Sequence, residues 1–356
     1  MRRRTTLISA GAIAAGLVLG SSACTGAPTA TPQPRETGDE ELIAVFRADL
    51  AGKDTRAAVA VVDGDDVRTA FVNAGPTTAF ESGSITKTFT GLLLAEAIAR
   101  GEVELDHTVG QYLDLGDSPA ASVSLGDLAA HQSGLPTFPT DPEWIAQAEP
   151  AFLAGEDAID ETVEELLAEA AAEPLAPDAP PQYSNMGAAL VGQAVAAAAG
   201  TDFATLLRER ILEPLGLEQT TLPLVAEDVP ETLAPGLTGD GEPAEPSSLA
   251  AYAPAGGIVT TVGDLAGYAQ AVIDGPFGDS AALESRPGLD GGGIGYFWGV
   301  EQRGDHELVS HDGMTQGFSS LLLIDRTAGT AVVVLVNRGG RSLNGLGERL
   351  LALADG

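Results

Sequence analysis

Cysteine, lysine and tryptophan are the residue types that this sequence has least of. Its 356 residues include one cysteine, Cys24, and two lysines, Lys53 and Lys87. A single cysteine excludes any disulfide within the chain, so the fold must be stabilised by packing. The four histidines and the cysteine show no spacing typical of a metal site, and no complete phosphate-loop or dinucleotide motif is present. We therefore expect neither a metal nor an organic cofactor.

Positive charge is scarce as well. Eighteen Lys and Arg residues are outnumbered by 51 Asp and Glu residues, which gives a formal net charge of −33 at pH 7. So acidic a surface repels the phosphates of nucleic acids and the headgroups of anionic lipids. We therefore expect no nucleic-acid partner.

The first 23 residues are typical of a lipoprotein signal peptide. Three arginines at positions 2–4 precede an apolar run, residues 7–19, that is too short to span a membrane. The run ends at small residues directly before Cys24, where a lipid would be attached. We expect an extracytoplasmic protein that this lipid anchors to the outer face of the cytoplasmic membrane. Ordinary cleavage would instead leave Cys24 as a free thiol on a secreted protein, and the Sec and twin-arginine export routes both stay open.

Residues 24–39 are rich in Thr, Pro and Ala, which predicts a flexible tether before a domain at 40–354. Alternating strand patterns occur near both ends of that domain, in residues 57–63, 67–74, 307–312, 317–324 and 331–337. Helical patterns occur in residues 41–51, 84–100, 162–172, 188–199, 203–212 and 343–354. The pattern predicts an α+β fold: an antiparallel sheet built from both chain ends and flanked by helices, with an inserted all-α lobe at roughly 105–245. We expect a monomer.

One of the two lysines lies three residues after a serine, in Gly83-Ser84-Ile85-Thr86-Lys87. Positions i and i+3 of a helix share one face, so Ser84 Oγ and Lys87 Nζ can meet. A lysine amine can lose its proton when it is desolvated, whereas arginine cannot. The helix 84–100 is apolar over more than one stripe, which predicts that Lys87 is buried. This is the nucleophile-and-base pattern of Ser-x-x-Lys acyl-transfer enzymes.

Two further motifs carry groups that suit such chemistry. Tyr183 and Asn185 precede a predicted helix and offer a phenolic proton and an amide. Taken alone, they could equally be a buried tyrosine and a helix cap. His311-Asp312-Gly313 ends a predicted strand, where the histidine supplies a titratable cation and the glycine permits close approach of a substrate. A lone histidine at such a position is more often structural.

In this order, Ser-x-x-Lys, Tyr-x-Asn and His-x-Gly resemble the motifs of the serine β-lactamase-related family. That family includes class C β-lactamases, DD-peptidases, D-aminopeptidases and related esterases. Further stretches resemble its landmarks in the same order: FESGSITKTFTGLLLAEAIARGEVELDHTVGQYL, LGDLAAHQSGLP, PQYSNMGAALVG, ILEPLGLEQT, APAGGIVTTVGDLAGY and HDGMTQGFSSLLLIDRTAGTAVVVLVN. The resemblance covers essentially residues 40–354 and implies a β-lactamase/transpeptidase-like fold.

The resemblance implies a role for each motif residue. Ser84 would be the nucleophile and Lys87 its general base. Tyr183 would carry a proton to or from the leaving group, and Asn185 would position Lys87 and the substrate. Which of Lys87 and Tyr183 takes the first proton is left open by the sequence. His311 stands where class C β-lactamases carry the lysine of a Lys-Thr-Gly segment.

The same resemblance implies that the backbone N–H groups of Ser84 and Met314, next to Gly313, form the oxyanion hole. Asp312 departs from the threonine common in carboxylate-recognising members. A pocket-facing Asp312 would repel a substrate carboxylate and favour an ester or a free amine. Strand alternation equally allows it to face away from His311.

These implications define the expected function. We expect an extracytoplasmic serine hydrolase that forms an acyl-enzyme with D-Ala-D-Ala-type peptides or with esters. The alternatives are a β-lactamase proper and a penicillin- or peptidoglycan-binding protein that acylates without turnover. The expected partners are thus a small-molecule, ester or peptidoglycan-stem-type substrate and, through Cys24, the membrane.

Overall fold

The computed structural model describes residues 35–47, 49, 54–175, 180–288 and 292–354. The predicted signal peptide, Cys24 and most of the predicted tether lie outside the described residues. The end of that tether is a correction, because β1 (Glu36–Gly38) is a strand that pairs with β3 (Asp66–Val72). The folded part therefore begins a few residues before position 40.

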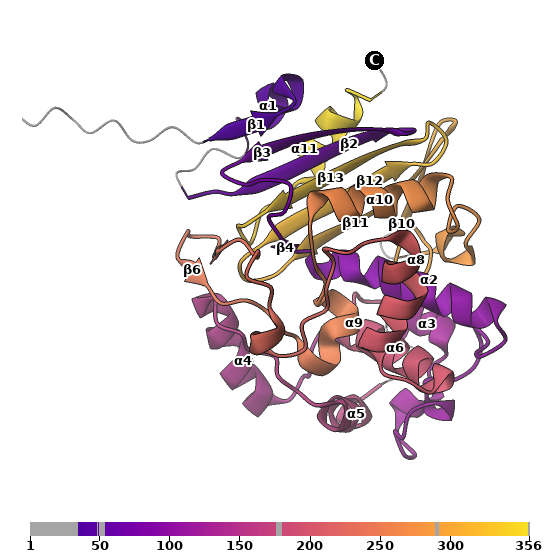
Figure 1. The fold of residues 1–356 in the computed structure, drawn as a ribbon. Helices are drawn as coiled ribbons and strands as arrows, with labels where there is room; N and C mark the ends of the chain where they lie inside the picture. Colours follow the sequence, from indigo (N-terminus) through magenta and orange to yellow (C-terminus); the bar gives the residue numbers. More distant parts are fainter. Residues whose placement is uncertain (1–34, 48, 50–53, 176–179, 289–291, 355–356) are drawn as a thin grey trace, which may run out of the picture. The chain divides into compact units, whose positions relative to one another are not determined.

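The centre of the fold is an antiparallel sheet of nine strands that joins both ends of the chain (Figure 1). Its order is β1, β3, β2 (Ala57–Asp63), β13 (Thr330–Val336), β12 (Ser319–Asp325), β11 (His306–Met314), β10 (Gly299–Arg303), β9 (Gly293–Ile294) and β8 (Arg286–Pro287). The predicted fold class is confirmed. The strands predicted at 57–63 and 67–74 correspond to β2 and β3, which pair antiparallel across a tight turn after Asp63.

Each face of the sheet packs against helices, because successive side chains of a strand point to opposite faces. Ala57, Val59 and Val61 of β2 pack with α1 (Glu40–Phe46) and α11 (Asn344–Leu351) on one face. Ala58 and Ala60 point to the other face, toward α2 (Thr86–Ala99), α10 (Val262–Ile273) and the helical lobe. Figure 1 shows α1 and α11 above the sheet and the remaining helices below it.

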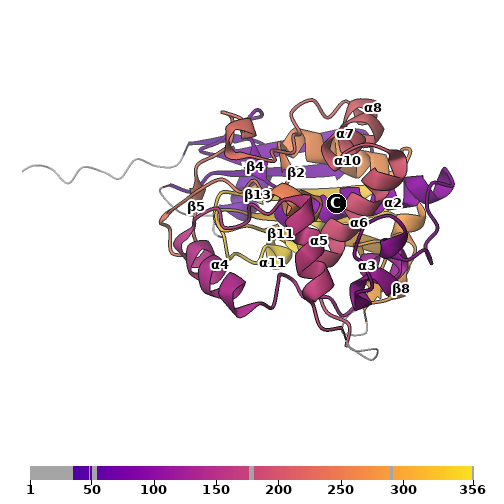
Figure 2. The same cartoon turned by 90° about the horizontal axis from the view of Figure 1, so that it is seen from below.

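The helical lobe lies in front of the sheet in Figure 2. Its helices are α3 (Leu125–Ala129), α4 (Pro142–Ala154), α5 (Val163–Ala172), α6 (Asn185–Ala199), α7 (Phe203–Leu207), α8 (Glu213–Leu215) and α9 (Ala253–Gly256). Helix α6 packs between α2 and α9 in the larger core. The lobe thus extends past the predicted limit at about 245. Two small ladders, β4 (Phe80–Glu81) with β7 (Val259–Thr260) and β5 (Gly236–Leu237) with β6 (Pro243–Ala244), complete it.

Several element boundaries differ from the sequence-based ones for local reasons. Helix α1 stops at Phe46, and α6 begins three residues earlier than expected because Ser184 caps it through the Gly187 N–H. Ser84 lies in a 3-10 turn, Gly83–Ile85, that precedes α2. The predicted helix from position 203 continues through a π-helical turn to Leu215. Helices α4 and α10 were not among the helices predicted from the sequence.

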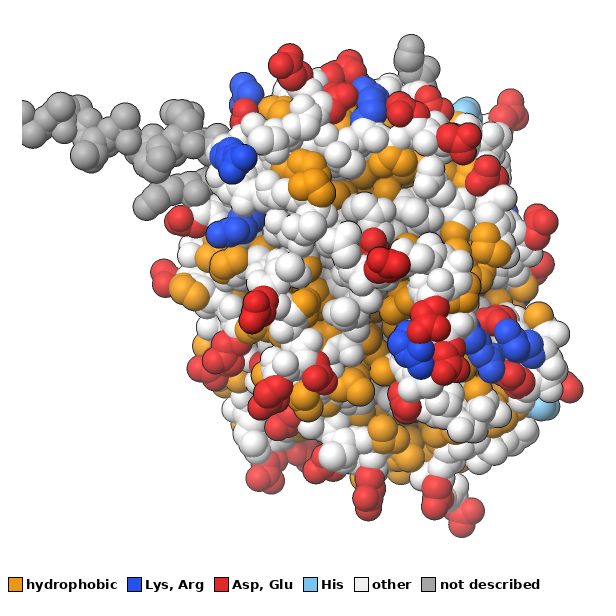
Figure 3. Space-filling view, viewed as in Figure 1, with side chains coloured by type: hydrophobic (Ala, Val, Ile, Leu, Met, Phe, Trp, Pro, Cys, Tyr) orange, Lys and Arg blue, Asp and Glu red, His pale blue; other side chains and the backbone are white. Residues whose placement is uncertain are grey.

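Acidic side chains are spread over the face shown in Figure 3, and arginines frequently lie beside them. Ion pairs such as Arg210–Glu102 and Arg303–Glu348 account for much of the positive charge of the described residues. Within the described ranges, no single helix is long and apolar enough to cross a membrane. Only α6 and the α7–α8 stretch pass that test together, as a pair bent by 80°.

Candidate active site

Ser84 is the one residue between positions 79 and 95 that is not buried. Strand β4 leads directly into the Gly83–Ile85 turn, which places the Ser84 hydroxyl at the surface of a cavity while α2 runs into the core. Gly83 has φ +50°, and a β-carbon on it would lie 2.7 Å from the backbone nitrogen of Met314. Only glycine therefore allows the nucleophile turn to approach β11 this closely.

Lys87 is completely buried on the first turn of α2, beneath Ser84. Its Nζ lies 2.9 Å from Ser84 Oγ, 2.7 Å from Asn185 Oδ1 and 2.6 Å from the Ala255 carbonyl oxygen. Burial lowers the pKa of Lys87 well below 10.5, although the Asp312 carboxylate opposes that shift. A neutral amine has two hydrogens and one lone pair. Asn185 Oδ1 and the Ala255 oxygen can only accept, so the lone pair is left for the Ser84 hydroxyl hydrogen.

The threonines of α2 hold α9 over Lys87. Thr90 Oγ1 donates to the Pro254 carbonyl oxygen at 2.7 Å, and Thr86 Oγ1 accepts from the Ile258 N–H at 3.1 Å. These bonds give the buried threonine hydroxyls of α2 a hydrogen-bond partner, and they fix the backbone around Ala255. The acceptor of the Lys87 amine is thereby supplied by a segment 168 residues away in sequence.

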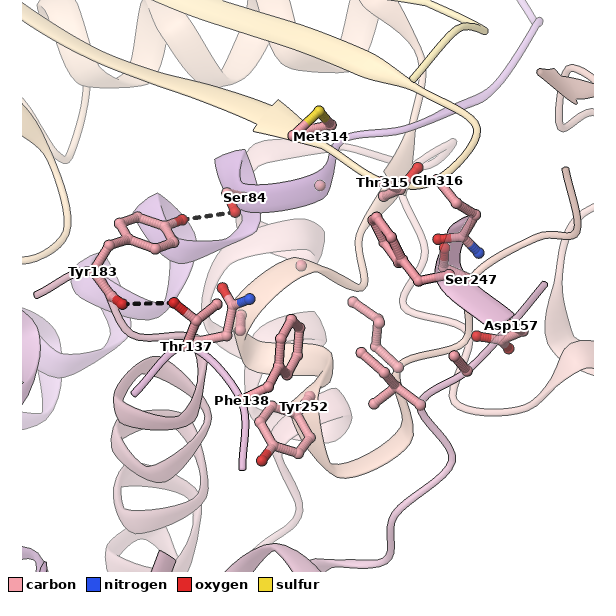
Figure 4. A pocket seen from close by; sticks show the side chains of 18 of the residues that line it. Ser84, Thr137, Phe138, Asp157, Tyr183, Ser247, Tyr252, Met314, Thr315 and Gln316 are labelled. Atoms are coloured by element: carbon pink, nitrogen blue, oxygen red, sulfur yellow. Dashed lines mark hydrogen bonds between the residues drawn. The ribbon is translucent and has the colours of Figure 1, made fainter. Parts of the chain in front are cut away.

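Tyr183 donates its phenolic hydrogen to Ser84 Oγ at 2.7 Å (Figure 4). Burial raises the pKa of Tyr183 above its usual value of 10, and the Asp312 charge raises it further, so the side chain is a phenol at neutral pH. Thr137 Oγ1 donates to the Tyr183 carbonyl oxygen at 2.9 Å and holds the loop. The opposite pKa shifts favour Lys87 over Tyr183 as the first base.

His131 supports this loop from behind. It is buried, has φ +56°, and its ring lies 4.5 Å from the Tyr183 ring. Its Nδ1 accepts from the Ser184 N–H at 3.2 Å, which requires the neutral form. Burial accordingly lowers its pKa to about 3. His131 is a structural residue of the Tyr183 loop.

His311 lies inside β11, whereas the sequence had placed it at a strand end. Its ring is 6.4 Å from the Tyr183 ring, and its Nδ1 is hydrogen-bonded to the Asp312 carbonyl oxygen at 2.6 Å. Burial and the nearby Lys87 lower the pKa of His311 to about 4, although Asp312 opposes the shift. The titratable cation that the sequence offers at this position is therefore uncharged at neutral pH. His311 is a neutral polar group in the site.

Asp312 points to the face of β11 opposite to His311. Its cross-strand partner is Leu321, which packs on the α1–α11 side, whereas His311 pairs with Leu322 on the helical side. Cross-strand partners share a face of the sheet. Asp312 is exposed at the rim of the cavity, so its charge acts on the site without a direct contact with Ser84.

Gly313 brings β11 against the nucleophile segment. A β-carbon there would overlap the Ser82 carbonyl oxygen, which accepts from Ser320 Oγ at 2.6 Å. The Thr315 N–H points to the Phe318 carbonyl oxygen at 3.0 Å. Because successive N–H groups of a strand alternate in direction, the Met314 N–H points away from β12, toward the nucleophile turn. This geometry suits the expected oxyanion hole.

The cavity in front of Ser84 has a volume of about 410 Å³. Its wall beyond Ser84 is largely apolar, with Phe138, Phe152, Ile159, Leu249 and Tyr252. In Figure 4, Phe138 and Tyr252 lie below Ser84, and Asp157 lies on the right-hand side of the cavity. Among the described residues that line it, the side chains with a net charge are two acids, Asp157 and Asp312, and there is no arginine or lysine.

Two acids of the site were missed by the sequence reasoning. Glu81 is buried directly before the nucleophile turn and accepts from the N–H of Ser247 at 2.7 Å and from its hydroxyl at 3.1 Å. Thr315 donates a third hydrogen bond to it, yet burial raises the pKa of Glu81 to about 7. Asp157 follows α4 and accepts from Ser248. Glu81 lies within the landmark stretch that begins at Phe80, but no motif singles it out, and Asp157 lies outside every quoted stretch.

One group of potential metal ligands occurs in the described ranges, Glu104, Asp106 and His107, which is surface-exposed or half-buried and away from the cavity.

The sequence model of the Beta-lactamase family matches residues 42–355. The chain belongs to the β-lactamase family. The resemblance found in the sequence is thereby confirmed.

Three known proteins illustrate what this β-lactamase-family protein is similar to. "Beta-lactamase-like protein 2" of Dictyostelium discoideum is 30% identical over 53% of this chain and 35% of its own length, so the chain spans about a third of that relative. "Penicillin-binding protein 4" of Amycolatopsis lactamdurans is 27% identical over 73% of this chain and 72% of its own. The structure titled "A class C beta-lactamase" has a TM-score of 0.74 at 20% identity and covers 87% of this chain and 94% of that one.

Proposed function

We propose that this protein is a serine hydrolase that forms an acyl-enzyme on Ser84 and that esters are its preferred substrates. The observation that carries the catalytic part is the buried Lys87 amine, hydrogen-bonded to Ser84 Oγ and to two groups that only accept. Such an amine can take the Ser84 proton as Oγ attacks a carbonyl carbon. A surface lysine, protonated at neutral pH, could not.

The remaining groups complete the reaction. The N–H groups of Ser84 and Met314 would stabilise the oxyanion of the tetrahedral intermediate. Tyr183, held as a phenol against Ser84 Oγ, would donate its proton to the leaving oxygen and regain one from Lys87. The acyl-enzyme ester would then be hydrolysed by water, with the same residues acting in reverse.

The charges of the cavity support the choice of an ester. D-Ala-D-Ala-type peptides and β-lactams both carry a carboxylate, for which a binding site needs a cation. The described lining residues offer Asp157, Asp312 and a neutral His311, while Lys87 is buried behind Ser84. A carboxylate would therefore be repelled, and an uncharged ester would not.

Steady-state turnover of the purified protein on a p-nitrophenyl ester, nitrocefin and a D-Ala-D-Ala peptide tests the proposal. We expect Ser84-dependent hydrolysis of the ester, with kcat/KM well above that for the two carboxylate-bearing substrates. Faster turnover of nitrocefin would make the protein a β-lactamase proper, and faster turnover of the peptide a DD-carboxypeptidase. Stoichiometric acylation without turnover of any of the three would instead make it a penicillin- or peptidoglycan-binding protein.

We further propose an extracytoplasmic, monomeric protein anchored through a lipid on Cys24. The basic residues 2–4, the apolar run 7–19 and the lone cysteine after small residues support this location. Metabolic labelling with a fatty acid is expected to mark the wild type and not Cys24→Ser. Recovery of the wild type in the soluble secreted fraction would contradict the anchor, and size-exclusion chromatography of the chain without residues 1–23 tests the monomer.

A further inference from the structure

The end of the cavity opposite to Tyr183 carries a carboxylate that has no cationic partner among the residues that the structure describes. Figure 4 shows Tyr183 and Ser84 on one side of the cavity and Asp157 on the other. Asp157 Oδ2 accepts from the Ser248 N–H at 3.1 Å and from the Ser248 hydroxyl at 2.8 Å. Both bonds go to one oxygen, and no hydrogen bond from another described residue reaches Oδ1. Asp157 is half-buried and lines the cavity.

The charges around Asp157 disfavour its carboxylate form as long as no cation is bound beside it. Its charged neighbours Glu245, Asp160 and Glu81 are all acids, and no described lysine, arginine or histidine forms an ion pair with it. Burial and these neighbours raise the pKa of Asp157, because each disfavours the carboxylate. A bound cation would remove this cost, whereas a bound anion would increase it.

The wall between Ser84 and Asp157 suits a chain that ends in such a cation. Phe138 and Tyr252, whose ring centroids are 5.6 Å apart, line this stretch together with Ile159 and Leu249. Aliphatic segments pack well on such a surface, and aromatic rings also attract cations. Because Tyr183 would protonate the leaving group, the leaving group lies on its side of Ser84. The acyl part of a substrate would therefore extend toward Asp157.

We propose that this cavity binds an acyl group with an apolar segment next to the scissile carbonyl and a guanidinium or ammonium group at its end, held by Asp157. This inference rests on the proposed function, since it assigns the acyl side of the same acyl-enzyme. It adds a recognition residue that lies outside the Ser-x-x-Lys, Tyr-x-Asn and His-x-Gly motifs.

Matched acyl esters test the inference. We would compare p-nitrophenyl esters whose acyl chains end in a guanidino group with esters that end in a ureido group, over a series of chain lengths. The two groups have nearly the same shape and differ in charge, and neither attacks its own ester readily. At one preferred length, the wild type is expected to show a guanidino-to-ureido ratio of kcat/KM of about tenfold or more. Because the attraction is electrostatic, that ratio is expected to fall as salt is added.

Substitutions then assign the preference to one residue. Asp157→Asn can still accept from Ser248, and it is expected to bring the guanidino-to-ureido ratio close to one. The matched control Asp160→Asn removes the same charge three residues away, at an exposed position that does not line the cavity. It is expected to leave most of the ratio intact. The ratio is independent of the amount of folded protein, so partial misfolding of a variant does not obscure the result.

The outcomes separate the inference from the proposed function. A wild-type ratio near one at every chain length, or an unchanged ratio in Asp157→Asn, overturns the cation site even while Ser84-dependent ester hydrolysis persists. Equal losses in Asp157→Asn and Asp160→Asn would also overturn it, because they would show a general effect of negative charge. Absence of ester hydrolysis and of covalent labelling at Ser84 would overturn the proposed function itself.

Discussion

Lys87 Nζ, on α2, lies 2.6 Å from the carbonyl oxygen of Ala255, on α9. This bond and the one to Asn185 Oδ1 occupy two directions around the amine with acceptors, so the third is available for the Ser84 proton. Burial disfavours the ammonium form at the same time. The hydrogen-bond geometry and the lowered pKa of Lys87 both support its role as the base, and both can be tested.

Substitution of the base is expected to be severe even when positive charge is kept. Lys87→Arg places a guanidinium that cannot accept a proton, so kcat/KM for a neutral ester is expected to fall about a hundred- to ten-thousand-fold, nearly as far as in Lys87→Ala. In the wild type, kcat/KM is expected to rise with pH as Lys87 loses its proton, with a midpoint well below 10.5. Near-normal activity of Lys87→Arg would instead identify Tyr183 as the sole base.

The nucleophile can be identified by covalent labelling. A fluorophosphonate probe is expected to add one label to the wild type and none to Ser84→Ala, because Ser84 alone has the Lys87 amine beside it. Ser184→Ala is the control. Ser184 caps α6 by accepting from the Gly187 N–H, so its loss is expected to cost about 1 kcal/mol of stability without removing the label. A label that survives in Ser84→Ala would contradict the mechanism.

His311 is expected to be kinetically silent near neutral pH. With a pKa of about 4 it is neutral from about pH 5 upward, so pH profiles for an anionic and a neutral substrate are not expected to diverge around pH 6.5. His311→Lys introduces a side chain whose ordinary pKa, about 10.4 against about 6.5 for histidine, makes it a stronger candidate for a cation in the cavity. It is expected to raise kcat/KM for a carboxylate substrate relative to a neutral ester by about tenfold. A wild-type divergence centred near pH 6.5 that disappears in His311→Lys would show that the imidazolium binds the anion.

Glu81 is expected to make stability depend on pH. Its pKa is about 7 in the folded protein against 4.5 as the ordinary value, so the folded state holds more protons between those limits. Stability therefore falls as pH rises through this window. Glu81→Gln is expected to gain stability relative to the wild type from pH 5 to pH 7, measured by thermal unfolding. Glu165→Gln is the control. Hydrogen bonds from Thr162 lower the pKa of Glu165, so the stability of this variant relative to the wild type is expected to change in the opposite direction.

Close approach at Gly313 is expected to be essential for the oxyanion hole. A methyl group there would overlap the Ser82 carbonyl oxygen and push β11 away from Ser84. Gly313→Ala is expected to lower the rate of ester hydrolysis about a hundredfold or more and to cost about 1–3 kcal/mol of stability. Gly75→Ala, where nothing lies within 4 Å of the new methyl group, is expected to change neither. Full activity of Gly313→Ala would exclude this role for β11.

The sequence by itself was enough for the features that depend on near neighbours in the chain. The three-residue spacing of Ser84 and Lys87 predicted their contact. Alternating patterns predicted five of the nine strands of the sheet, β2, β3, β11, β12 and β13, but not β1, β8, β9 and β10. Motif order, through the family resemblance, also brought Tyr183 and Asn185 to the same site. Helix α4 was missed because Pro142 and Pro150 lie in a stretch where only one residue, Ala148, is buried.

Only the tertiary structure decided the charge states. His311 is neutral because helices distant in sequence bury it beside Lys87, and Asp312 faces away because the β11–β12 register pairs it with Leu321. The contact of the Ala255 carbonyl oxygen with Lys87 comes from packing between distant segments. Asp157, which forms no ion pair with another described residue, lies in a segment with no motif. A pKa reflects every dipole, charge and water molecule within a few ångströms of a group. Those neighbours are assembled by packing, so spacing along the chain cannot reveal them.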